Sequence, residues 1–144
     1  VFEFWQEDFY AIFDNQDDNA KRQFVTSDEL LQMNLLLLGE GHCLTDHILS
    51  VCMLDKARVN SNFYDASLNT LIQMSLAGMG TTLVPKMALE QICHCRDVVV
   101  SVPLAEPSPH RRLAFVSRLN YARVNDIKML SDIFTAALSE HSGE

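Results

Sequence analysis

The sequence predicts an α/β domain with a mostly parallel sheet flanked by helices. Short apolar runs of strand length alternate along the chain with segments of helical spacing, and the connections between them are short. The 144 residues suffice for one domain with its own core. The hydrophobic share of 48% is ordinary for a globular protein, and no apolar run approaches the roughly 18 residues that cross a bilayer.

A strand and a short helix are predicted near the start of the chain. Phe9 to Phe13 is an aromatic and apolar run that favours a strand, and the polar segment Asp14 to Ala20 favours a turn. Thr26 and Glu29 have the spacing of a capping box, which predicts a short helix over the two leucines that follow.

A buried strand and a second helix come next. Leu35 to Leu38 is a continuous apolar run, which predicts a strand buried on both faces. Gly39 and Gly41 interrupt this run, and the residues from Cys43 to Cys52 indicate a short helix. Since ligands collect beyond the carboxyl ends of parallel strands, the loop Gly39–His42 is a candidate position for a site.

The middle of the chain repeats the alternation. Asn62 to Ala66 is a second short strand candidate, and Ser67 is a suitable N-cap for the helix that follows. That helix is expected to stop at Gly78. Its apolar residues at helical spacing are Leu68, Leu71, Ile72 and Leu76.

The last third of the chain predicts three more strands and two helices. Gly80 leads into a strand from Thr81 to Val84 that Pro85 ends, and a short helix is expected from Met87 to Ile92. Val98 to Val102 indicates another buried strand.

Three prolines, Pro103, Pro107 and Pro109, predict that regular structure is absent until a last strand from Leu113 to Val116. A final helix is expected from about Asn125. One face of it is apolar and consists of Ile127, Leu130, Ile133, Phe134 and Leu138.

Charge and the chain start limit the function classes. The formal net charge of −8 argues against nucleic-acid binding by this segment, which would need a basic face. The first residues show neither an initiator Met nor a signal peptide, so we expect a fragment of a longer cytoplasmic protein and no membrane association.

Cysteine usage fits the same compartment. A chain of this size and apolarity needs no disulfides to fold, so its four cysteines are expected to be mostly reduced thiols. A disulfide in such a protein would be transient and sensory.

Two of these cysteines lie nine positions apart on one predicted helix. If Cys43 opens that helix, outward-pointing backbone N–H groups and the helix dipole favour its thiolate. In a regular helix, nine residues move Cys52 about 13 Å along the axis and onto the opposite face. A disulfide needs Cα atoms within roughly 7 Å, so the two sulfurs can meet only if the helix unwinds. Such a pair has the geometry of a redox switch.

The segment Leu35 to His47, followed by Cys52, closely resembles the sensing segment of the OxyR-type regulators, the hydrogen-peroxide sensors among the LysR-type transcriptional regulators. The Gly-His-Cys motif with its second cysteine is highly specific. Ala66 to Leu71 and the glycine-rich strand start at Ala77 to Pro85 agree with the family as well. The resemblance covers nearly the whole chain. Two features depart from it, namely Thr45, where a well-studied family member has an arginine, and the pair Cys93 and Cys95.

The resemblance implies a domain organisation. Full-length members have an N-terminal winged helix-turn-helix that binds DNA, a linker, and two lobes shaped like a periplasmic binding protein. By this likeness, residues 14–104 form the second lobe with its redox segment at 41–52, and residues 1–13 and 111–118 are crossing strands. Residues 125–141 are then the C-terminal helix of the first lobe, and the DNA-binding domain is absent. Implied partners are hydrogen peroxide, DNA and RNA polymerase for the full-length activator, and copies of the chain in a dimer or tetramer.

The resemblance also implies roles for site residues. Cys43 is the peroxide-reactive cysteine and Cys52 the resolving one, which forms the disulfide with the Cys43 sulfenic acid. His42 and Thr45 are candidates to orient peroxide or supply a proton, and Arg112 matches a family arginine that approaches the reactive thiol. Asp46, whose charge would oppose a nearby thiolate, is expected to cap the helix or pair with Arg112.

Other functions were weighed against this one. A small-molecule-binding LysR-type effector domain with incidental cysteines would bind its ligand in a cleft near Gly41–Thr45 and Ser67. A thiol peroxidase is disfavoured because no Cys-x-x-Cys or peroxidase-like Pro/Thr box precedes Cys43, so we expect no enzyme. No cofactor or metal is expected either, because opposite helix faces cannot supply a tetrahedral set and Cys93-His94-Cys95 lacks the usual two-residue gap.

Overall fold

The computed structural model describes residues 1–39, 41–55, 57, 59–63, 66–95 and 97–142, and the chain divides into two compact units. Unit 1 consists of Val1–Glu7 and Arg111–Glu144, and unit 2 of Asp8–His110. The segment expected as one crossing strand is two strands, β1 (Phe2–Glu7) and β2 (Phe9–Asp14), which belong to different units. The assignment of these units to lobes remains a prediction.

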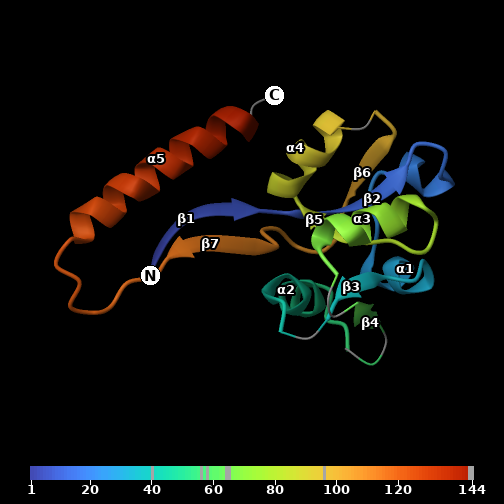
Figure 1. Cartoon of the computed structure of the whole chain (residues 1–144), viewed down its shortest axis with the longest axis horizontal. Helices are drawn as coiled ribbons and strands as arrows, with labels where there is room; N and C mark the ends of the chain where they lie inside the picture. Colours follow the sequence, from blue (N-terminus) through green and yellow to red (C-terminus); the bar gives the residue numbers. More distant parts are fainter. Residues whose placement is uncertain (40, 56, 58, 64–65, 96, 143–144) are drawn as a thin grey trace. The chain divides into compact units, whose positions relative to one another are not determined.

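Unit 1 is a two-stranded antiparallel ribbon with a helix packed on it. β1 pairs with β7 (Arg111–Phe115), and α5 (Val124–Ser142) lies against β1 (Figure 1). Phe4 stacks on Phe115 with ring centroids 4.7 Å apart, and Phe134 contacts both rings. The expected final helix is thus confirmed, although Phe134 and other apolar residues of α5 stay exposed, namely Met129, Leu130 and Ile133. None of the helices among the described residues is long and apolar enough to cross a membrane.

The described strands of unit 2 form a three-stranded sheet and a two-stranded one. The three-stranded sheet has the order β5 (Leu83–Pro85), β2 and β6 (Val99–Pro103), and in the other sheet β3 (Leu36–Leu38) pairs with β4 (Asn60–Phe63). The two sheets join between β3 and β5, where Leu35 forms a bridge with Thr81 and the Leu36 N–H donates to the Thr81 carbonyl at 2.8 Å.

Strand direction follows from the pairings. β3 is parallel to β4 and to the start of β5, while β5 and β6 are both antiparallel to β2. All described strands of unit 2 except β2 therefore run the same way, which agrees with the predicted α/β class and its mostly parallel strands. β2 runs in the opposite direction between β5 and β6. Alternation of strands and helices along the sequence predicts parallel strands that are joined through a helix. β2 does not follow a helix in the sequence, so this pattern does not predict its direction.

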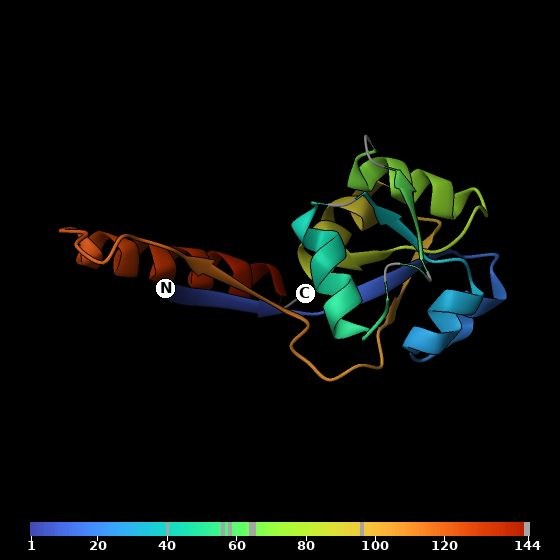
Figure 2. The same cartoon turned by 90° about the horizontal axis from the view of Figure 1, so that it is seen from below.

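Helices cover both faces of these strands, as Figure 2 shows for α3 on one side and for α1 and α2 on the other. The two faces follow from the strand period of two. Phe9, Ala11 and Phe13 point into the core with α1 (Ser27–Gln32) and α2 (Cys43–Val51). Ile12 points to the other side, into the core with α3 (Leu68–Leu76) and α4 (Lys86–Cys95). The predicted burial of Leu35 to Leu38 on both faces is confirmed.

Local signals in the sequence fix most helix starts. Thr26 accepts a hydrogen bond from the Glu29 N–H and the Glu29 carboxylate accepts one from the Thr26 N–H, so the predicted capping box is present at α1. Ser67 caps α3 as predicted, and Gly78 follows its end with φ of +83°. α4 extends beyond the predicted Met87–Ile92 at both ends.

Several element predictions differ from the structure, among them two later strand starts, since β5 begins at Leu83 and β7 at Arg111. The strand expected at 62–66 is found at Asn60–Phe63, and residues 64 and 65 lie outside the described residues. The turn at 14–20 includes a 3-10 helix, Asp18–Lys21. Pro103 was expected to lie outside regular structure, but it is the last residue of β6. This strand lies at the sheet edge, where a missing N–H donor leaves no ladder partner unsatisfied.

Candidate functional site

The candidate site lies where β3 leads into α2, at the carboxyl end of a strand (Figure 1). Gly41 has φ of +89°, a conformation that L side chains rarely adopt, and this glycine turns the chain towards the helix. His42 is the N-cap residue of α2, and its carbonyl accepts from the Asp46 N–H at 3.2 Å. Its side chain makes no capping hydrogen bond. The expected capping role of Asp46, an acidic residue in the first turn, stays a prediction.

Cys43 is the first residue of α2, as predicted, and it is exposed. Backbone N–H groups of a first helical turn have no intrahelical acceptor, and together with the helix dipole they stabilise negative charge at this end. A thiol in that position is accessible to a small oxidant. Among the expected neighbours, His42 is half-buried and Asp46 is exposed in the first turn.

Thr45 has a structural contact that sequence reasoning missed. Its side chain is buried, with 3% exposed, and its hydroxyl donates to the Leu38 carbonyl at 3.0 Å. This bond ties the first turn of α2 to the end of β3. The single hydroxyl hydrogen of Thr45 is thereby used inside the protein, so only the oxygen lone pairs could face another group.

Cys52 lies at the other end of the helix, at its C-cap, and it is 4% exposed. Its N–H donates to the Ile48 carbonyl at 2.9 Å, and its side chain belongs to the core between α1, α2 and the sheet. Burial is the main cause that raises the pKa of the Cys52 thiol. A hydrogen bond with Ser27 acts in the opposite direction, and the charge of Glu106, the smallest of the three effects, raises the pKa again. Cys52 is therefore held as a neutral thiol in the core.

The C-terminus of α2 is closed by an unusual residue. The Met53 and Leu54 N–H groups donate to the Ser50 and Leu49 carbonyls at 3.2 and 2.9 Å, which is the Schellman pattern. Glycine usually occupies the left-handed position of this motif, but here Met53 has φ of 52°. A side chain in this conformation costs roughly 1–2 kcal/mol, so the helix end is less stable than one closed by glycine.

The two thiols are thus separated by an intact helix. Both cysteines are free, and α2 is regular from Cys43 to Val51. At 1.5 Å per residue this spacing keeps the Cα atoms of Cys43 and Cys52 far beyond the roughly 7 Å that a disulfide allows. One thiol faces solvent and the other faces the core. The two sulfurs therefore cannot bond while α2 keeps this form.

The remaining predicted site residues lie elsewhere. Arg112 is on β7 in unit 1, where its guanidinium is 3.7 Å from a Glu3 carboxylate oxygen, so the expected pairing with Asp46 is not tested. His47 is exposed on α2. Cys93 and Cys95 belong to the last turn of α4, and their side chains lie outside the described part of the chain. Among the described residues, no three His, Cys, Asp or Glu side chains form a group that could hold a metal ion.

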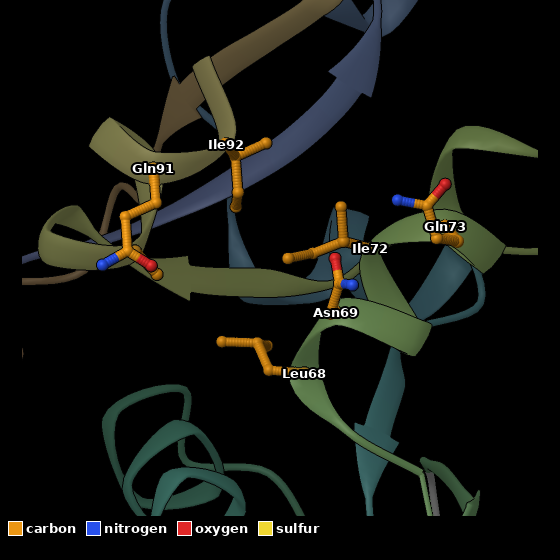
Figure 3. A pocket seen from close by; sticks show the side chains of 7 residues that line it. Leu68, Asn69, Ile72, Gln73, Gln91 and Ile92 are labelled. Carbon is orange, nitrogen blue, oxygen red and sulfur yellow. The ribbon is translucent and has the colours of Figure 1, made fainter. Parts of the chain in front are cut away.

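A separate groove lies between α3 and α4, on the sheet face opposite α2 (Figure 3). Its lining mixes apolar side chains with three carboxamides, and contains no residue of the Gly41–Thr45 segment. Figure 3 shows side chains of α3 and α4 on its two sides. The lining residues are Leu68, Asn69, Ile72, Gln73, Ala88, Gln91 and Ile92. A ligand in this groove would not contact either cysteine of the candidate site.

Comparisons with known proteins agree on one family. The family model for the LysR substrate binding domain matches residues 1–139. A probable hydrogen peroxide-inducible genes activator from Streptomyces viridosporus is 31% identical over 137 residues, which cover 94% of this chain and 44% of that protein. The DNA-binding transcriptional dual regulator OxyR from Escherichia coli is 33% identical over 122 residues, or 85% of this chain and 40% of that protein. The chain thus spans less than half the length of these curated relatives.

Solved structures give the same result. A hydrogen-peroxide-bound OxyR mutant from Corynebacterium glutamicum superposes with a TM-score of 0.83 at 27% identity, covering 96% of this chain and 44% of that one. The reduced OxyR regulatory domain from Pseudomonas aeruginosa gives a TM-score of 0.75 at 28% identity, covering 90% of this chain and 62% of that one.

Proposed function

The chain belongs to the LysR substrate-binding domain family, and on this premise we propose that it is the redox-sensing regulatory domain of a peroxide-responsive transcription regulator. The observation that carries the proposal is the pair of thiols on one segment. Cys43 is exposed at a helix N-terminus, and Cys52 is buried at the C-cap of the same helix. The likeness to hydrogen-peroxide-inducible activators and to a peroxide-bound OxyR supports peroxide as the oxidant.

The chemistry has two steps. The Cys43 thiolate attacks one peroxide oxygen, the O–O bond breaks, and the leaving hydroxide takes a proton to become water. Cys43 is now a sulfenic acid. The Cys52 sulfur then attacks the Cys43 sulfur, the S–O bond breaks, and the released oxygen leaves as a second water with the Cys52 proton. One peroxide is reduced and two thiols are oxidised to one disulfide.

Supporting roles follow the family resemblance and the local geometry of α2. His42, at the N-cap beside Cys43, and Arg112 are proposed to orient peroxide and stabilise charge at the reacting sulfur. Thr45 is proposed to act mainly by fixing the first turn of α2 through Leu38, and Asp46 by interacting favourably with the helix dipole.

Closure of the disulfide would change the fold locally. Because the two sulfurs cannot meet while α2 is regular, residues 41–52 must rearrange, and the core must release Cys52. We propose that residues 14–104 form the second of two lobes, with 1–13 and 111–118 as crossing strands and 125–141 as a helix of the first. In the full-length regulator, repacking at this surface would change a dimer or tetramer and the spacing of its DNA-binding domains, and so its action on RNA polymerase.

Titration with hydrogen peroxide separates this function from a peroxidase. The reduced protein, mixed with a reducing thiol too weak to reopen the disulfide quickly, is expected to consume one equivalent per chain and then stop. Peptide mapping should find Cys43 joined to Cys52. Continued consumption at a constant rate would instead show an enzyme. An intact protein with no such peptide would favour a small-molecule-binding effector domain, for which the groove of Figure 3 is the candidate position.

A further inference from the structure

The two ends of α2 are held in different ways. At the N-terminal end the Thr45 hydroxyl donates to the Leu38 carbonyl at 3.0 Å, and Thr45 is 3% exposed. At the C-terminal end the chain leaves the helix through Met53, which has φ of 52° and is 90% exposed. A buried hydrogen bond therefore fixes the first turn to β3, whereas the side chain that follows the last turn packs against little of the protein.

The conformation of Met53 weakens the closure at the C-terminal end. The Met53 and Leu54 N–H groups donate to two of the last carbonyls of α2, those of Ser50 and Leu49. These hydrogen bonds depend on the left-handed backbone of Met53, in which the Cβ of an L residue lies too close to the following carbonyl oxygen. Glycine has no Cβ and would not have this contact. Because the Met53 side chain is so exposed, its packing does not offset the strain.

The same closure holds Cys52 in the core. Cys52 precedes Met53, is 4% exposed, and its N–H donates to the Ile48 carbonyl at 2.9 Å. Leu54 follows Met53 and packs against the core cluster that contains Cys52. If Met53 leaves the left-handed region, the chain changes direction at this point, so Cys52 and Leu54 cannot both keep their places. Release of the strain at Met53 therefore frees the buried thiol.

We propose that Met53 is a strained hinge, which makes α2 open from its C-terminal end and sets how fast Cys52 reaches an oxidised Cys43. The hinge rests on the proposed function for its purpose. While the last turn unwinds, the Thr45 hydrogen bond keeps the first turn on β3, so Cys52 moves towards Cys43. The covalent step is the one given above. The S–S bond forms as the S–O bond of the Cys43 sulfenic acid breaks, and the oxygen leaves as water with the Cys52 proton.

Hydrogen exchange in the reduced, intact chain tests the hinge without any peroxide. Met53→Gly removes the Cβ and is expected to slow exchange of the Cys52 and Leu54 amides at least about fivefold, after correction for intrinsic rates. Met53→Ala is the matched control, because alanine keeps the Cβ and loses only the exposed thioether. It is expected to stay within about twofold of the parent. The Asp46 amide, which donates to the His42 carbonyl at the other end of α2, should not respond to either variant.

The rate of disulfide formation should follow the same order. From the Cys43 sulfenic acid, the disulfide with Cys52 is expected to form about fivefold more slowly in Met53→Gly and at the parent rate in Met53→Ala. It should form faster in Met53→Val, because a β-branched residue fits the left-handed region worse than methionine does. The rate at which peroxide consumes the Cys43 thiol should not change in these variants, since Met53 lies beyond the opposite end of the helix.

These measurements separate the hinge from the proposed function. The predicted order of amide exchange without any disulfide after peroxide would support the hinge and reject the sensor. A Cys43–Cys52 disulfide that forms at one rate in all three variants would retain the sensor and reject the hinge. Equal slowing of exchange in Met53→Gly and Met53→Ala would also reject the hinge, because the thioether and not the backbone conformation would then control the helix end.

Discussion

Replacing Cys43 by serine is expected to lower the rate constant for oxidation by hydrogen peroxide on the order of a hundredfold or more, because a hydroxyl does not ionise near neutral pH and is the weaker nucleophile. Cys43 is the thiol that the structure places in the open, at the N-terminal end of α2. Mass spectrometry of each cysteine-containing peptide after one equivalent of peroxide measures the effect and keeps Cys93 and Cys95 separate from it.

Cys52→Ser is the matched control for this variant. It removes the buried thiol and leaves the exposed one, so the first oxidation step should keep its rate and the Cys43 sulfenic acid should accumulate. A dimedone-type reagent traps that species. If Cys43→Ser oxidises as fast as the parent protein, the assignment of Cys43 as the peroxide-reactive residue is wrong.

The second large effect concerns the packing of α2. Ile48 is 1% exposed and belongs to the same core cluster as Cys52, so it anchors α2 in the core. Ile48→Ala should lower the free energy of unfolding by about 2–5 kcal/mol, the cost of a deleted buried side chain and the cavity that it leaves. Urea denaturation followed by circular dichroism measures the change.

Two further variants serve as comparisons for the free energy of unfolding of Ile48→Ala. Ile48→Val should cost only about 0.5–1.5 kcal/mol, and His47→Ala, at the exposed position next to it, should stay within about 0.5 kcal/mol of the parent. Because Ile48 holds α2 in its helical form, the Cys43–Cys52 disulfide is also expected to form faster from the sulfenic acid in the Ile48→Ala variant than in the parent protein. A loss below about 1 kcal/mol for Ile48→Ala would show that α2 is not anchored by this side chain.

The local elements were predictable because their signals are local. The capping box at Thr26, the N-cap at Ser67 and the helix start at Cys43 each depend on residues within one turn, and all three are found in the structure. The α/β class followed from alternating patterns of the same short range. The reversed direction of β2 could not follow from them, since strand direction within a sheet depends on pairings between distant segments.

The candidate site, too, was predictable from the sequence only in part. Sequence motifs place Cys43 and Cys52 on one helix, and the structure finds one of them exposed and the other buried. The hydrogen bond between Ser27 and Glu106 was missed, because these residues are separated by 79 positions and neither belongs to the motif. The sequence predicted that Thr45 orients peroxide, because it lies near Cys43. Its burial and its hydrogen bond to the Leu38 carbonyl are seen only in the structure. Sequence patterns indicate which face of a helix is buried, whereas hydrogen bonds between distant segments can be identified only from the tertiary structure.

Hydrogen exchange at the backbone amides of residues 43–52 tests most directly whether this segment holds two structures. In the reduced protein the amides from Asp46 to Cys52 have helical acceptors, beginning with the Asp46 N–H on the His42 carbonyl and ending with the Cys52 N–H on the Ile48 carbonyl, and NMR should find them protected. After one equivalent of peroxide we expect protection to be lost across the segment, while the amides of β2 and α3 keep theirs. A Cys43–Cys52 disulfide present by mass, with the protection of residues 43–52 unchanged, would contradict the account.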